Sequence, residues 1–118
     1  LACLGYHADA PVRVEATLQS SKVAMGQAVT FDVTIMADTD VPVLIDYRIK
    51  FVRAGGKTSE KVFKLKQGEV RKGTPYKARK AHKLKGGAST FTLYPGIHQI
   101  TVQVNGRDHA ALDFELTD

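Results

Sequence analysis

The chain of 118 residues has the length of one domain, and its 43% apolar and 25% charged residues are ordinary for a soluble globular protein. It has no apolar run near the roughly 20 residues that a membrane helix needs, and its single cysteine excludes an internal disulfide. The formal charge is +5, but residues 48–85 alone carry +12, from 14 Lys or Arg and two acids, which suggests an anionic partner unless the run is only a solvated basic face.

Apolar and polar residues alternate with a period of two along most of the chain, which is typical of β-strands. The first such run is residues 12–18. The clearest is residues 29–35, where β-branched residues dominate. A turn at residues 37–40 precedes a third, longer strand at residues 43–52. No segment has a convincing helical period.

The basic middle of the chain is punctuated by glycines. The pair at 55–56 predicts a turn, after which residues 62–65 begin another strand. Gly68 and the cluster at residues 73–75 are interpreted as further breaks. Residues 76–84 predict an edge strand whose outer face is basic.

The last third of the chain predicts a hairpin. Residues 94–96 form a turn, residues 98–104 alternate, and Asn105–Gly106 is a strong hairpin signal because both residues tolerate positive φ. Residues 110–116 form the returning strand.

The register of this hairpin follows from burial. A strict two-residue loop would turn Leu112 and Phe114 outward, because residues directly opposite share a face. One extra loop residue or a bulge restores the match and places His98 opposite Phe114. Neither register pairs His98 with His109.

These elements predict an all-β fold. About seven short strands separated by turns favour an immunoglobulin-like antiparallel β-sandwich over residues 10–118, with residues 1–9 as a linker or the end of a preceding domain. An OB-type barrel is the alternative.

No catalytic constellation is expected. Nucleophilic enzymes need a base beside the nucleophile, and the serines lie in turns without a surrounding motif. No two histidines are spaced as a metal pair on one strand face, so a packed or surface His98 is the favoured interpretation. We predict no catalytic residue, no metal site and no cofactor.

Cysteine use favours the cytoplasm, since a secreted sandwich often carries a disulfide. The start Leu1-Ala2-Cys3 nevertheless resembles the end of a bacterial lipoprotein cleavage site. A lipid-anchored envelope sandwich therefore stays open beside an ordinary Cys3 in a preceding helix or linker. We expect a cytoplasmic protein that has no membrane partner.

The order of several short segments resembles that found in a known protein family. The chain resembles the C-terminal immunoglobulin-like extension of bacterial DNA alkylation repair proteins, which are similar to HEAT-repeat alkylpurine glycosylases. The most specific block runs from Asp46-Tyr47 to Lys61-Val62-Phe63-Lys64. The segments that carry the resemblance are residues 45–56, 59–64, 68–69, 80–82, 94–98 and 104–106.

The resemblance implies an accessory domain. The chemistry of that family, release of a positively charged alkylated base, belongs to helical repeats that this chain does not contain. No catalytic residue is therefore carried over, and the implied partner is the N-terminal helical-repeat domain of the same protein.

The basic middle supports a second partner, the backbone of duplex DNA. Lysines outnumber arginines in it, which suits non-specific phosphate contact better than base readout. A structural or protein-interaction module without DNA binding is the competing hypothesis. The residues we expect to contact DNA, on one outer surface, are Lys61, Lys64, Lys66, Arg71, Lys72, Lys77, Arg79, Lys80, Lys83 and Lys85.

Overall fold

The computed structural model describes residues 12–52, 57–84 and 95–117. These residues form eight β-strands, and no helix that could cross a membrane occurs among them. In chain order the strands are β1 (Val12–Leu18), β2 (Lys22–Ala24), β3 (Ala28–Ala37), β4 (Val41–Val52), β5 (Thr58–Val70), β6 (Tyr76–Lys83), β7 (Gly96–Val104) and β8 (Arg107–Thr117).

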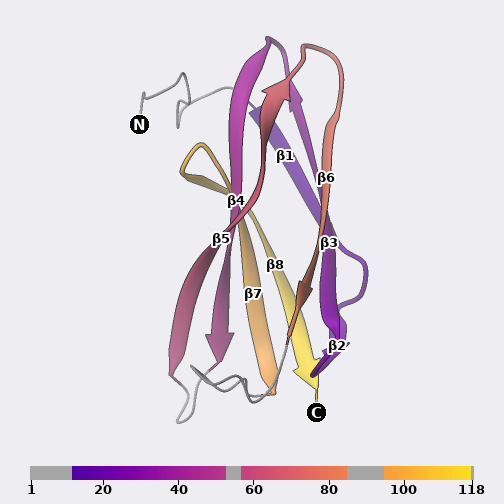
Figure 1. Cartoon of the computed structure of the whole chain (residues 1–118), viewed down its shortest axis with the longest axis vertical. Helices are drawn as coiled ribbons and strands as arrows, with labels where there is room; N and C mark the ends of the chain where they lie inside the picture. Colours follow the sequence, from indigo (N-terminus) through magenta and orange to yellow (C-terminus); the bar gives the residue numbers. More distant parts are fainter. Residues whose placement is uncertain (1–11, 53–56, 85–94, 118) are drawn as a thin grey trace.

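The strands form two facing sheets (Figure 1). The three-stranded sheet has the order β1-β3-β6, and the five-stranded sheet has the order β2-β8-β7-β4-β5. The predicted immunoglobulin-like sandwich is confirmed, and the barrel alternative is wrong.

One strand was not predicted. β2 has three residues and pairs with β8 in parallel, whereas the other pairings are antiparallel. It is too short to show a period, and it begins next to a turn in which the Lys22 N–H donates to Ser20 Oγ at 3.3 Å. Val23 of β2 is buried. β2 belongs to the five-stranded sheet, whereas β1 and β3, which flank it in the chain, belong to the three-stranded sheet.

Alternate residues of β3 and β4 point between the sheets, as their period of two predicts. Tyr47 has the largest of the fully buried side chains. Its ring packs edge-on against Phe31 at 5.1 Å between centroids and stacks on Phe63 at 5.2 Å. This aromatic cluster joins β3, β4 and β5 across the core.

The β7–β8 hairpin has the register expected from burial. Asn105 and Gly106 form its two-residue turn with φ of 52° and 83°. A bulge in β8 follows the turn: Gln103 faces Asp108 whereas Val102 faces Ala110, which leaves His109 as the extra residue. The bulge brings His98 opposite Phe114, which confirms the predicted facing of the two strands.

A bulge in β5 was not expected. The register against β4 shifts so that Ile45 faces Lys66 whereas Asp46 faces Lys64, which leaves Leu65 as the extra residue. A bulge of this kind changes which side chains of a strand point inward. Lys66 consequently lies on the inward side of β5 although it is exposed.

β5 and β6 belong to different sheets and lie side by side at one edge of the sandwich. They are joined by a turn at residues 71–75 (Figure 1). The carboxylate of Asp40 accepts the Lys72 N–H at 2.8 Å, and the Gly73 N–H donates to the Ala37 carbonyl at 3.3 Å. We call β5, this turn and β6 together the β5–β6 edge.

Gly68 does not end a strand as the sequence suggested, because β5 continues through it to Val70. A Cβ atom at Gly68 would overlap the hydroxyl oxygen of Tyr76 on β6. The missing side chain therefore lets Tyr76 lie across β5.

The variant Gly68→Ala should destabilise the domain. The added methyl group displaces Tyr76, and overpacking of this kind costs about 1–3 kcal/mol. Urea unfolding followed by circular dichroism measures the loss. In a Tyr76→Phe background, which lacks the overlapping hydroxyl, the loss should shrink; an equal loss in both backgrounds would contradict this explanation.

Candidate nucleic-acid interface

The residues predicted to contact DNA fall on the β5–β6 edge wherever the structure describes them. Nine of the ten are described, and they belong to β5, the turn or β6. Lys85 lies outside the described residues, as do Cys3 and the segment of residues 1–9 predicted to be a linker.

Three of these cations form a row on the outer face of the three-stranded sheet. Lys77, Arg79 and Lys83 are exposed and alternate with inward residues such as Ala78. At 3.2–3.4 Å per residue, the row from Lys77 to Lys83 spans about 20 Å.

Three others lie on the inward sides of their strands. Lys61, Lys66 and Lys80 each pair in register with a buried residue of the neighbouring strand, yet Lys61 and Lys66 are exposed and Lys80 is only partly buried. The Lys66 ammonium lies 4.9 Å from the centroid of the Tyr76 ring and donates to the Lys77 carbonyl at 3.5 Å. Lys66 thus bridges the two sheets.

The remaining three lie apart from both groups. Arg71 and Lys72 are on the turn, and Lys64 is on the outer face of the five-stranded sheet beside Asp46. Burial raises the pKa of Asp46, and the charge of Lys64 opposes that rise.

The ten cations were expected on one outer surface, but the nine that the structure describes do not share one. β5 and β6 lie in different sheets, so their outer faces point away from each other. The described charges therefore lie around the β5–β6 edge and point in several directions.

The arginines of the edge are already paired with acids. Arg79 Nε lies 2.7 Å from Asp32 Oδ1, and Arg71 Nε lies 3.0 Å from Glu69 Oε1. The hydrogen bond to Asp32 raises the pKa of Arg79. Each pair reduces the positive charge that these arginines present to a partner.

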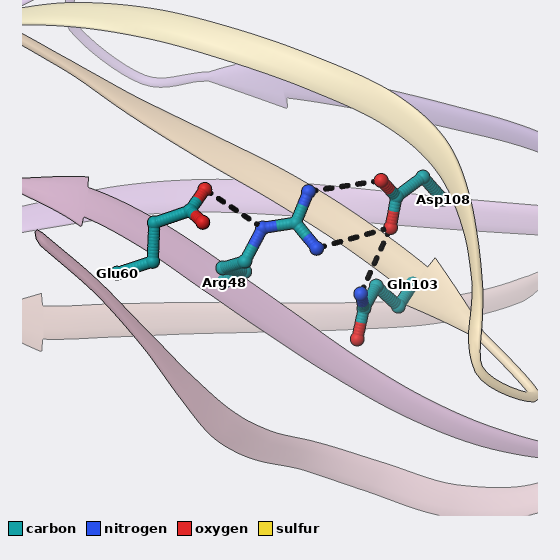
Figure 2. A network of polar contacts seen from close by, with 4 residues as sticks. All are labelled: Arg48, Glu60, Gln103 and Asp108. Carbon is teal, nitrogen blue, oxygen red and sulfur yellow. Dashed lines mark hydrogen bonds and ion pairs between the residues drawn. The ribbon is translucent and has the colours of Figure 1, made fainter.

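A third arginine is held in a network on the outer face of the five-stranded sheet (Figure 2). Arg48 Nη2 lies 2.9 Å from Asp108 Oδ2, and Arg48 Nε lies 3.2 Å from Glu60 Oε2. Gln103 Nε2 donates to Asp108 Oδ1 at 2.8 Å. The pKa of Asp108 is lowered by its hydrogen bonds from Arg48 and Gln103. Arg48 therefore ties β5 to the β7–β8 hairpin.

The lysines of β6 differ from these arginines. Lys77, Lys80 and Lys83 form no ion pair with any residue that the structure describes. Their ammonium groups can therefore meet an anionic partner with no acid already bound to them, whereas each guanidinium group is shared with an acid. The formal charge of residues 48–85 overstates that availability, because three arginines within it are neutralised locally.

Sequence reasoning missed a polar contact beneath this edge. The Tyr47 hydroxyl lies 2.8 Å from Nδ1 of half-buried His82, so it joins the five-stranded sheet to β6. Burial raises the pKa of Tyr47 to about 12, and burial followed by the charge of Lys80 lowers the pKa of His82. Tyr47 thus keeps its proton, and its hydroxyl can donate a hydrogen bond to Nδ1 of a neutral His82 ring.

The other histidine of interest, His98, was expected to be either packed or on the surface, and it is packed in the core. His98 is 1% exposed, stacks on Phe114 and accepts the Val52 N–H at Nδ1 at 3.1 Å. No cluster of three metal-ligating side chains occurs in the described ranges.

Comparison with known families decides the classification. A family model described as "Uncharacterised protein YhaZ, C-terminal Ig-like domain" matches residues 13–118. The chain belongs to this family. The uncharacterised protein YhaZ of Bacillus subtilis (strain 168) is 33% identical over 117 residues, which cover 98% of this chain and 32% of that protein.

A solved structure is also similar to the chain. The Pseudomonas fluorescens alkylpurine DNA glycosylase AlkC, bound to DNA containing an abasic site analog, superposes with a TM-score of 0.89 at 26% identity. The match covers 98% of this chain and 33% of that one. Together with the family match, it confirms the resemblance to an extension of DNA alkylation repair proteins. The chain spans about a third of the length of these relatives.

More distant likeness shows the fold alone. A β-glucosidase from Listeria innocua in complex with isofagomine superposes with a TM-score of 0.72 at 13% identity, over 93% of this chain and 16% of that one. The sandwich itself therefore does not specify an activity.

The lowered pKa of His82 predicts that acid weakens the fold. As pH falls, the unfolded chain, whose histidines have the usual pKa of about 6.5, takes up the proton before the folded chain does. The stabilisation that a neutral His82 contributes is complete above the unfolded-state pKa of about 6.5. It is lost as the pH falls through the pKa of His82 in the folded chain, which is lower. Denaturant unfolding between pH 7.5 and pH 5 should show this decrease.

The matched variant is His82→Gln, which keeps a polar group near Tyr47 but does not titrate. Its unfolding free energy should fall less steeply with acid than that of the parent chain. The pKa of His109 is also lowered by burial, so the His82→Gln/His109→Gln chain should have the flattest profile. A His82→Gln profile parallel to the parent would contradict the assignment.

Proposed function

We propose that this domain is the accessory C-terminal domain of a DNA alkylation repair protein and that it holds the DNA backbone through the β5–β6 edge. The observation that carries the proposal is that Lys77, Lys80 and Lys83 of β6 lack acidic partners among the described residues. The likeness to AlkC, which was solved bound to DNA, supports it.

The chemistry of the edge suits contact without sequence reading. Lysine ammonium groups on flexible stems neutralise phosphates as point charges, whereas base readout relies on planar, bidentate groups. The described arginines of the edge are engaged with Asp32 and Glu69. We therefore expect affinity that depends on charge and varies little with sequence.

The base-releasing chemistry would belong to another part of the protein. The family is a C-terminal domain of a protein about three times as long, and helical repeats N-terminal to this domain are the proposed catalytic partner. Because DNA is the proposed substrate, we place the protein in the cytoplasm. The domain itself would add affinity and not chemistry.

Binding of the full chain to a fluorescein-labelled duplex of unspecified sequence tests the proposal. With about five phosphate contacts, the slope of log affinity against log salt should be roughly −4 to −5. Fluorescence anisotropy over a series of KCl concentrations measures it. Absence of binding at about 50 mM salt would contradict the proposal and favour the protein-interaction alternative.

The matched variants carry the same change of charge at different places. Lys77→Gln/Lys83→Gln removes two cations from the β6 row and should make the slope shallower by about 1.8. Lys22→Gln/Arg107→Gln removes two cations from β2 and β8, strands that pair with neither β5 nor β6, and should change the slope little. Equal effects would show that net charge, not the edge, governs binding.

A further inference from the structure

A hollow opens on the outer face of the three-stranded sheet, within the proposed interface. Its volume is about 400 Å³, near the lower end of the roughly 300–1,000 Å³ that ligand pockets occupy. The hollow lies over one stretch of the β3–β6 pairing. Its lining residues are Asp32, Val33, Thr34, Lys77, Ala78 and Arg79.

The pairing of the strands explains the hollow. Val33 and Ala78 are directly opposite each other and point into the core, so only their backbone forms the floor. The pairs on either side of them, Thr34 with Lys77 and Asp32 with Arg79, point outward and form the walls. Residues two apart on a strand are separated by about 6.6 Å, which leaves room between the walls.

The walls carry one net positive charge. Lys77 has no acidic partner among the residues that the structure describes, and Arg79 is held by Asp32 through Nε at 2.7 Å and Nη2 at 3.4 Å. Asp32 thus restrains the guanidinium beside the hollow and cancels one of the two cations. A lining with charge +1 complements a phosphodiester, which carries −1.

We infer that this hollow seats a single backbone phosphate, which is contacted by Lys77 and Arg79 together and receives a hydrogen bond from the Thr34 hydroxyl. Asp32 is a positioning residue that holds Arg79 beside the hollow. The inference rests on the proposed DNA function. It adds that these two cations share one phosphate, whereas Lys83, about 20 Å along the strand from Lys77, serves another.

Salt dependence counts phosphates and therefore tests the sharing. The slope of log affinity against log salt changes by about 0.9 for each phosphate contact that is lost. Lys77→Gln/Arg79→Gln should make the slope shallower by about 0.9, because one phosphate is lost. Lys77→Gln/Lys83→Gln should make it shallower by about 1.8, because without Lys77 the charges of Arg79 and Asp32 cancel and the seat loses its phosphate, and the phosphate at Lys83 is lost as well.

The outcomes separate the inference from the proposed function. Suppose that the parent chain binds duplex DNA and that the slope becomes shallower by about 1.8 in both double variants. Lys77 and Arg79 would then contact separate phosphates, and the shared seat would be wrong. If the parent chain does not bind at about 50 mM salt, the proposed function and the seat are both wrong. Thermal unfolding of each variant confirms that it remains folded.

Two further measurements test the chemistry of the seat. Thr34→Val should weaken DNA binding roughly two- to tenfold with an unchanged slope, and Thr34→Ser should restore it; unchanged affinity in Thr34→Val would exclude the hydroxyl. Inorganic phosphate alone should shift the backbone amide signals of Thr34 and Lys77 only at millimolar concentrations. Saturation at micromolar concentrations would identify a site for free phosphate and overturn the assignment to DNA.

Discussion

The contact between Tyr47 and His82 fixes the position of β6 relative to β5. Tyr47 is a buried residue of the five-stranded sheet. Its hydroxyl oxygen crosses the core and lies 2.8 Å from Nδ1 of His82 on β6, the edge strand of the other sheet. Phe63 of β5 lies against both rings. Since hydrogen bonds across a core constrain geometry as well as energy, this cluster sets the spacing of the two strands that carry the basic side chains.

The passage of the chain from β5 to β6 determines how the charge is distributed. Two strands of one sheet would present a flat basic face, but strands of two sheets direct their side chains away from each other. The arginines along this path are paired with acids, and Arg48 links three strands through Glu60 and Asp108. The guanidinium groups thus link strands of the fold, and the ammonium groups of β6 have no acidic partner among the described residues.

Alternation of apolar residues was sufficient to predict most strands and the facing of β7 and β8, because burial leaves only one register in which Leu112 and Phe114 point inward. It failed where local composition misleads. Gly68 suggested a break, but it lies within a strand because Tyr76 needs its space. The ten cations could be listed from the sequence, whereas the pairing of Arg79 with Asp32 depends on the β3–β6 register. Contacts between distant strands, such as Tyr47 with His82, leave no periodic signal.

β5 and β6 are also edge strands of their sheets. Among the described strands, β5 pairs with β4 alone and β6 with β3 alone, so each presents one side of its backbone to the surroundings. Exposed strand backbone invites pairing with another molecule, and lysines together with a bulge discourage it by repulsion and irregular spacing. The side chains that suit a polyanion therefore also keep copies of the domain from joining sheet to sheet, and a chain stripped of them would be prone to aggregate.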